Sequence, residues 1–229
     1  MNTVPKQPFH PLIVCAIAVA FFFGCIASSH RTARTLESGQ GSFGLSYLQA
    51  NNLDQPDAEP VKLMGFDARV GLSRGFDWGL AYTLDLSSGN DNAFATVWGD
   101  FKVQLTNRDN AVGLPILSLG LMKGYVYDPA IQTHITSFPA LLSFRINNSL
   151  TATAQYRYEV LSEGFIPVSF EDPRSVYGLG FSVALADETS GNWIPRVGLF
   201  IGSFNSLTGG SDGDQGLVLN LGLTLDSPL

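Results

Sequence analysis

One histidine lies among side chains that could carry out hydrolysis. His134 is preceded by Asp128 and followed by Thr136 and Ser137. A histidine base, a hydroxyl nucleophile and a carboxylate are the parts of a hydrolase site. The same polar residues are also common in ordinary surface loops, where they have no catalytic role. The sequence therefore predicts no enzyme, with a hydrolase around His134 as the alternative.

Two carboxylates at a spacing of two residues, Asp212 and Asp214, could contribute oxygen ligands to Ca²⁺. The surrounding turn lacks the other positions of a calcium-binding loop, so it is expected to be a solvated turn. The two cysteines, Cys15 and Cys25, both fall within the first thirty residues, which excludes a disulfide framework and a cysteine metal site. We expect no metal and no cofactor.

The elements that must position any site are strands. Beyond residue 40 the chain consists of runs in which apolar residues alternate with small or polar ones, and this alternation is typical of a strand with two unlike faces. The last run is the clearest, because its leucines occupy every second position from 217 to 225. No segment beyond residue 30 has sustained helical periodicity. The runs lie at 42–49, 64–73, 78–85, 94–105, 114–126, 135–146, 150–160, 175–185, 194–203 and 217–225.

Ten such strands predict an all-β, closed antiparallel up-and-down barrel, although eight strands are also compatible with the pattern. The odd-numbered connections are 50–62, 86–93, 128–134, 162–174 and 204–215, and the even-numbered ones are 74–77, 106–113, 147–149 and 186–193. Membrane barrels have short periplasmic turns and longer outer loops. The two shortest and the three longest connections fall on the corresponding sides, so we expect both barrel termini in the periplasm.

The composition of the two faces favours a barrel that spans a membrane. A lipocalin-like barrel turns its apolar face inward, whereas a membrane barrel turns it toward lipid. The second face is mostly Gly, Ser, Ala and Thr, which suits a narrow lumen better than a water-facing surface. Aromatic residues also gather near the predicted strand ends, as in the girdles of membrane barrels. A periplasmic, lipid-anchored calyx that binds an apolar ligand is the alternative.

Nine charged residues of both signs fall on the predicted lumen face. Buried charges must be paired, and ten strands enclose little space. We therefore expect a lumen largely plugged by ion pairs, with a narrow channel for ions or a small solute as the alternative. Lys123 alone falls on the lipid face, where it extends to the interface or marks a bulge. The nine residues are Asp67, Arg69, Asp85, Asp100, Lys102, Arg145, Arg157, Glu159 and Arg196.

The chain begins with a targeting segment. A weakly basic start precedes the apolar stretch 12–23, and this is the pattern of a signal peptide. Residues 12–27 would span about 24 Å as a helix, whereas a membrane span of roughly 20 residues is about 30 Å long. The stretch ends in Phe22-Phe23-Gly24-Cys25, which resembles the lipobox of bacterial lipoproteins, although Phe22 stands where that motif usually has leucine. The resemblance implies a signal peptide at 1–24 and acyl chains such as palmitate on Cys25. Cleavage near Ser28, which would discard Cys25, is the alternative.

Residues 25–40 are predicted to be a polar tether that leads into a barrel domain at 41–229. The stretch 32–42 is similar to the segment before the first strand in bacterial outer-membrane barrel lipoproteins. Ile26 replaces the aspartate that would retain an enterobacterial lipoprotein in the inner membrane, so this resemblance implies the outer membrane. The expected partners are outer-membrane lipid, lipopolysaccharide, and the barrel-assembly and lipoprotein-processing machinery. A net charge of −7 without a basic run excludes nucleic acid. The predicted role is structural or surface interaction.

Overall fold

The computed structural model describes residues 31–54, 57, 59–86, 95–107, 109–127, 132–165, 171–186, 192–206 and 215–227. Cys25, Asp128 and the turn with Asp212 and Asp214 lie outside the described residues. Each of the ten predicted runs corresponds to one strand. The strands are β1 (Gly41–Asn52), β2 (Val61–Ser73), β3 (Phe76–Asp85), β4 (Ala95–Gln104), β5 (Pro115–Tyr127), β6 (Gln132–Arg145), β7 (Leu150–Ser162), β8 (Glu171–Ala184), β9 (Ile194–Ser206) and β10 (Gln215–Asp226).

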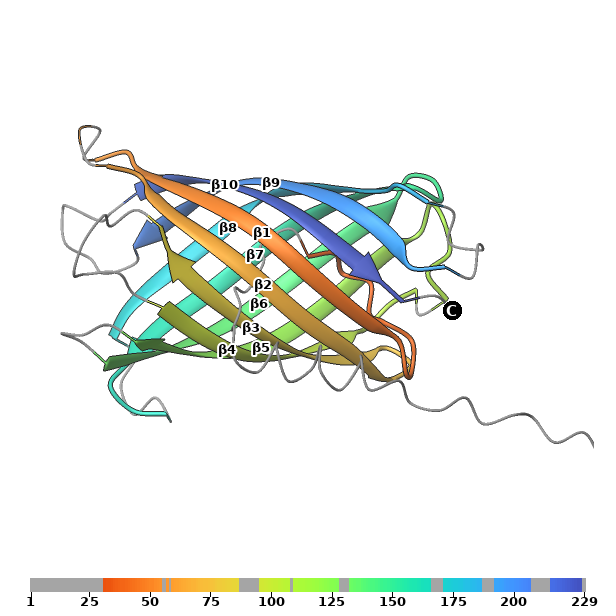
Figure 1. Cartoon of the computed structure of the whole chain (residues 1–229), viewed down its shortest axis with the longest axis horizontal. Helices are drawn as coiled ribbons and strands as arrows, with labels where there is room; N and C mark the ends of the chain where they lie inside the picture. Colours follow the sequence, from red (N-terminus) through yellow and green to blue (C-terminus); the bar gives the residue numbers. More distant parts are fainter. Residues whose placement is uncertain are drawn as a thin grey trace, which may run out of the picture.

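The ten strands form a closed barrel in which every strand pairs antiparallel with its sequence neighbours (Figure 1). β1 and β10 close the barrel, and their register places Ser42 opposite Asp226. The prediction of a closed ten-stranded antiparallel barrel is confirmed. Because the strand number is even, β1 begins and β10 ends at the same end of the barrel, which we call the terminal end. The opposite end is called the distal end.

The barrel is apolar outside and polar inside. On β10 the five alternating leucines are 38–48% exposed, whereas Asn220 between them is fully buried. The same contrast holds around the barrel, where every strand has at least one large apolar side chain that is exposed and most of the buried side chains are polar or charged. An apolar belt around a closed barrel is the arrangement that faces lipid. The apolar interior that a calyx needs is therefore absent from the described lumen.

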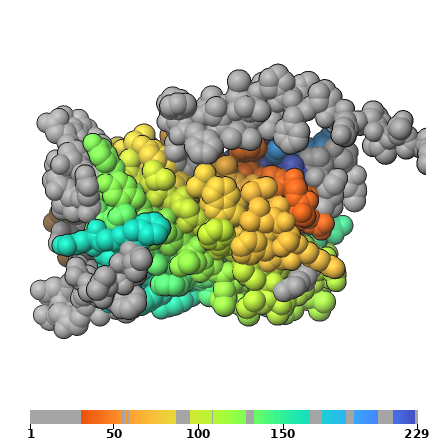
Figure 2. Space-filling view, turned by 90° about the horizontal axis from the view of Figure 1, so that it is seen from below, coloured from red at the N-terminus to blue at the C-terminus, as the bar shows by residue number. Residues whose placement is uncertain are grey.

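The outer wall contains Lys62, near the distal end of β2, and Lys123 on β5, which lies at the position that the alternation predicts. The pairing of β5 with β4 has no register shift, so a bulge does not explain this position. Lys123 Nζ donates a hydrogen bond to Thr136 Oγ1 at 2.8 Å and lies 5.5 Å from the ring centre of Phe165. Figure 2 shows part of this wall from outside, with the strands coloured from orange to green packed side by side. No helix within the described ranges is long and apolar enough to cross a membrane.

Connection length does not distinguish the two ends as the sequence predicted. Several strands extend beyond their predicted limits. Four distal connections are shorter than predicted, at 53–60, 128–131, 163–170 and 207–214, and the fifth spans 86–94. The longest connection, 105–114, lies at the terminal end. Within it Asn107 forms side-chain hydrogen bonds with Ala111 and Leu114, so this connection is built as a compact turn. The periplasmic placement of the termini therefore stays a prediction.

Candidate functional site: the lumen and the segment inside it

The residues before β1 lie inside the barrel. We call residues 31–40 the inner segment; they are the described part of the predicted tether. The chain turns back into the lumen at Gly39, whose φ of 85° is unstrained only for glycine. Gly39 N donates to Gly71 O at 2.9 Å, and Gly71 N donates to Gln40 O at 2.9 Å. These bonds attach the base of the inner segment to β2 at the terminal end.

The backbone of the inner segment is hydrogen-bonded to side chains of β4, β5 and β6. Thr35 donates from both its N and its Oγ1 to Gln104 Oε1, each at 2.8 Å. Ala33 N donates to Ser143 Oγ at 2.7 Å, and its carbonyl accepts a hydrogen bond from Ser118 Oγ. The wall thus replaces the strand partners that this extended segment lacks, as buried backbone groups require.

A small apolar contact accompanies these polar ones. Ala33 is fully buried and packs against Ile116 and Leu141, which point into the lumen from β5 and β6. A larger side chain at position 33 would have to displace both of them, because the three are already in contact. The inner segment is therefore matched to this half of the wall in shape as well as in hydrogen bonding.

Charged residues join the inner segment to the middle of the lumen. Arg69 forms ion pairs with both Asp77 and Asp100. Arg31 Nη1 donates to Asp100 Oδ2 at 2.8 Å, and Arg31 Nη2 lies 3.9 Å from Asp67 Oδ2. The side chains of Arg69, Asp77 and Asp100 are at most 6% exposed. Charges buried to this degree are tolerated only when paired, and here each carboxylate is close to at least one arginine.

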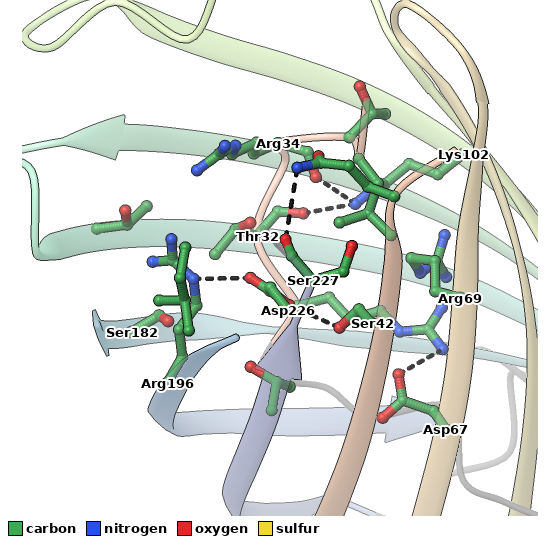
Figure 3. Close-up of a pocket in the computed structure, with 17 residues that line it drawn as sticks. Thr32, Arg34, Ser42, Asp67, Arg69, Lys102, Ser182, Arg196, Asp226 and Ser227 are labelled. Carbon is green, nitrogen blue, oxygen red and sulfur yellow. Dashed lines mark hydrogen bonds and ion pairs between the residues drawn. The ribbon is translucent and has the colours of Figure 1, made fainter. Parts of the chain in front are cut away.

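Lys102 fixes the backbone of the inner segment directly. Its Nζ donates to the carbonyl oxygens of Thr32 at 3.1 Å and Arg34 at 2.6 Å (Figure 3). The same Nζ lies 3.4 Å from Asp77 Oδ2, which also accepts a hydrogen bond from Leu36 N at 3.3 Å. One buried ammonium group therefore links β4, β3 and the inner segment.

Three further members of the predicted set form ion pairs apart from this network. Arg196 Nε is 2.8 Å from Asp226 Oδ2, and the other oxygen of Asp226 accepts a hydrogen bond from Ser42 Oγ at 2.7 Å. Arg157 Nε is 2.8 Å from Glu159 Oε1 on the same strand. The first pair lies where β1, β9 and β10 meet at the terminal end, and the second lies toward the distal end of β7.

The last two members of the predicted set occupy opposite ends of the lumen. Asp85 is buried at the distal end of β3. Arg145 at the terminal end of β6 donates to the carbonyl of Asn110 in the connection 105–114. The structure therefore places all nine predicted residues on the inner face and brings Asp67, Arg69, Asp100 and Lys102 together in one network.

The sequence-based set lacks three residues that complete the ion pairs: Arg31, Asp77 and Asp226. The alternation contains the signal for two of them, because Asp77 continues the inward positions of β3 and Asp226 continues those of β10. The predicted runs began at 78 and ended at 225, so these residues were assigned to connections. Nothing in the alternation identifies Arg31, because it is not part of a strand.

Several inward glycines make room for the lumen contents. A Cβ at Gly71 would clash with the carbonyl oxygen of Glu37 in the inner segment. A Cβ at Gly79 would lie 2.9 Å from Asp100 Oδ2 and 3.0 Å from Arg69 Nη2. The small residues on this face thus leave the space that the inner segment and the ion pairs occupy in the lumen.

Large apolar side chains also occupy the lumen. Trp98 and Met122 pack together with Ala81 and are each less than 8% exposed. Phe200 from β9 is 1% exposed, and Gly202 beside it would place a Cβ 2.7 Å from its ring. These rings fill space that the inner segment does not reach.

Three of the residues proposed for hydrolysis, His134, Thr136 and Ser137, are described by the structure. His134 and Thr136 lie on the outer wall, where the His134 ring is 5.1 Å from that of Tyr125. Ser137 is fully buried on the opposite, lumen face of β6. The Thr136 hydroxyl accepts a hydrogen bond from Lys123 Nζ. The part of the chain that the structure describes also contains no cluster of three His, Cys, Asp or Glu side chains that could hold a metal ion.

No protein-family model matches this sequence, and no curated protein matches it. Solved structures with a similar fold include the N-terminal β-barrel domain of OprF from Pseudomonas aeruginosa, at 12% identity and a TM-score of 0.29, covering 82% of this chain and 99% of that one. The toluene transporter TbuX of Ralstonia pickettii matches at 10% identity and a TM-score of 0.33, covering 89% and 92%. OccK11 (OpdR) of Pseudomonas aeruginosa matches at 12% identity and a TM-score of 0.26, covering 85% and 98%. These similarities are too weak to bear on function.

The class of protein follows from the geometry of the chain itself. A closed barrel with an apolar outer belt and a polar, ion-paired lumen is a transmembrane β-barrel of the bacterial outer-membrane type.

Proposed function

We propose that this protein is a lipid-anchored outer-membrane barrel whose lumen is plugged by its own inner segment and whose role is structural or surface interaction. The observation that supports the proposal is the inner segment, which is bonded to strands from β2 to β6 and shares buried carboxylates with Arg69. A solute crossing the barrel would have to separate these buried ion pairs. Separating a buried pair typically costs about 3–5 kcal/mol.

The proposal includes the untested parts of the sequence-based reading. Acyl chains on Cys25 anchor the mature protein, and the terminal end faces the periplasm. Outer-membrane lipid and lipopolysaccharide surround the wall, and the barrel-assembly and lipoprotein-processing machineries deliver it. The protein binds no nucleic acid, needs no cofactor and catalyses no reaction.

Membrane extraction of the wild type and of Cys25→Ser tests this proposal. We expect both proteins to resist carbonate washing, because the apolar belt holds the barrel in the bilayer without the anchor. Both are also expected to migrate differently on gels before and after boiling, as closed barrels do. A correctly exported and cleaved Cys25→Ser protein that is soluble in the periplasm would refute the transmembrane barrel. Mass spectrometry of the wild-type N-terminus reports the acyl chains, and an unmodified terminus after residue 28 would refute lipidation.

A narrow channel is the second candidate, and one feature of the lumen favours it. The inner segment is held by non-covalent polar contacts, and a cavity of ≈ 90 Å³ separates part of it from the facing wall. If the segment leaves, polar side chains line the space that it vacates. This candidate predicts conductance in planar bilayers that falls when Arg157 or Arg196 is replaced by glutamine. Wild-type protein that inserts and never conducts supports the plugged barrel instead.

A further inference from the structure

A cavity lies beside the inner segment. The polar contacts described above join the segment to β2 through β6. The cavity of ≈ 90 Å³ is lined by the segment and by residues of β1, β2, β4, β7, β8, β9 and β10. In Figure 3, Arg34 and Arg196 are drawn on one side of the segment, and Lys102 and Arg69 on the other. Arg34 and Arg196 therefore line this cavity from the segment and from β9.

The lining of this cavity is positive and rich in hydroxyl groups. Five cationic side chains line it, Arg31, Arg34, Arg69, Lys102 and Arg196, against two carboxylates, Asp67 and Asp226. Asp77 and Asp100 stand just behind the lining and pair with Arg69, so cations still outnumber carboxylates among the described residues. Hydroxyl groups complete the lining, at Thr32, Thr35, Ser42, Thr151, Ser182, Thr224 and Ser227.

We propose that this cavity binds a small doubly charged oxyanion of the phosphate or sulfate class. Guanidinium groups present a planar fork of donors that matches an oxyanion, and hydroxyl groups supply further donors. Arg34 contributes from the inner segment and Arg196 from β9, with Ser182 and Thr151 as hydroxyl donors from β8 and β7. Arg196 is already oriented by its 2.8 Å contact with Asp226, which is itself held by Ser42.

The bound oxyanion has a structural consequence that goes beyond a plugged barrel. It contacts the inner segment through Arg34 and the wall through Arg196 of β9. Binding therefore adds a link between the segment and this part of the wall. A ligand that binds only this arrangement stabilises it in proportion to its concentration.

Equilibrium dialysis of the full-length mature protein in detergent, with radiolabelled inorganic phosphate at constant ionic strength, tests this site. We expect saturable binding of one phosphate per chain, competition by sulfate, and no competition by chloride. Arg34→Gln and Arg196→Gln are each expected to weaken binding by tenfold or more, and Arg34→Lys, which keeps the charge without the planar fork, is expected to weaken it less than Arg34→Gln does. Arg74→Gln is the matched control, because Arg74 forms an exposed ion pair with Asp109 outside the lumen.

Heat-modifiable gel migration shows that each variant still forms a closed barrel, so that lost binding is not lost folding. If Arg196→Gln does not fold, Arg34→Gln decides alone, because Arg34 does not belong to the barrel wall. Binding that survives both substitutions, or that Arg74→Gln weakens equally, would overturn the proposed site. Absence of saturable phosphate binding to the folded wild type would overturn it as well.

Discussion

The charges in the lumen are arranged so that single residues serve several partners. Asp100 is close to both Arg69 and Arg31, and Asp77 is close to both Arg69 and Lys102. Removing one member of such a network leaves the others buried without their full set of partners. That residual cost, more than the lost attraction, makes buried ion pairs sensitive to substitution.

Arg69→Gln is therefore expected to destabilise the barrel by about 3–5 kcal/mol, because Asp77 and Asp100 stay buried without their shared cation. The measurement is the urea dependence of heat-modifiable migration for protein folded in lipid vesicles. Arg74→Gln, which removes an exposed ion pair in the connection after β2, is expected to change stability by less than about 1 kcal/mol. Equal effects of the two substitutions would show that the lumen network contributes no more than a surface pair.

Gly71→Ala tests the fit of the inner segment against β2. The added Cβ would clash with the carbonyl of Glu37, so we expect the segment to be displaced while the barrel stays closed. Trypsin should then cut the folded protein faster after Arg31 or Arg34. The rate should rise about tenfold for each 1.4 kcal/mol by which the substitution weakens the binding of the segment to the wall. Mass spectrometry of the digest identifies the cleavage sites.

Gly99→Ala is the matched control for this substitution, because a Cβ at Gly99 meets nothing within 4 Å. Its digestion rate should equal that of the wild type. A Gly71→Ala protein that resists trypsin as well as Gly99→Ala does would mean that the segment shifts without leaving its place.

At the level of single residues, the sequence predicted the lumen face better than it predicted the partners. Alternation assigns a side chain to a face, and all nine predicted charges lie on the inner face. Pairing depends on register around the barrel and on segments outside the strands, which alternation does not encode. Arg31 illustrates this limit, because its partners Asp67 and Asp100 are set by the fold of residues 31–40 and not by any repeat.

The strands are the elements that the sequence determines most directly. Each predicted run overlaps one strand, because a two-faced wall between lipid and a polar lumen imposes the same alternation on every strand. The ends were predicted less well, since strands such as β8 begin before the alternation becomes regular. The even spread of connection lengths between the two ends follows from these longer strands.

The destabilisation that a charged side chain causes on the outer face depends on how close its position lies to the middle of the bilayer. Leu221 lies near the middle of β10 and Leu225 near its terminal end, and both are exposed on the outer face. In a membrane, Leu221→Arg should lower the free energy of unfolding by about 2–4 kcal/mol and Leu225→Arg by about 0–1 kcal/mol. Unfolding in lipid vesicles measures both values. Equal costs for the two variants would contradict a belt that faces lipid at mid-strand.

At the scale of the whole molecule, the barrel and its plug are one covalent chain. The inner segment runs directly into β1 through Gly39, so closing the barrel also brings the segment to its binding wall. The effective concentration of a tethered ligand is high, which lets individually modest hydrogen bonds hold it in place. In the proposed plugged barrel, the folding of one chain is therefore enough to close the lumen.

Deletion of residues 31–38 tests whether this plug is what closes the lumen. We expect wild-type protein in planar bilayers to be silent and the deletion variant to conduct, because the vacated space is lined by Lys102, Gln104 and other polar groups. Trp98 and Met122 still narrow the lumen, so adding Trp98→Ala should increase the conductance of the deletion variant. Heat-modifiable migration confirms a closed barrel in each case. If the deletion variant is silent and the double variant conducts, the rings form a second closure in series with the segment. If both are silent, the wall side chains close the lumen without it, and the segment acts only to satisfy the buried charges around Arg69.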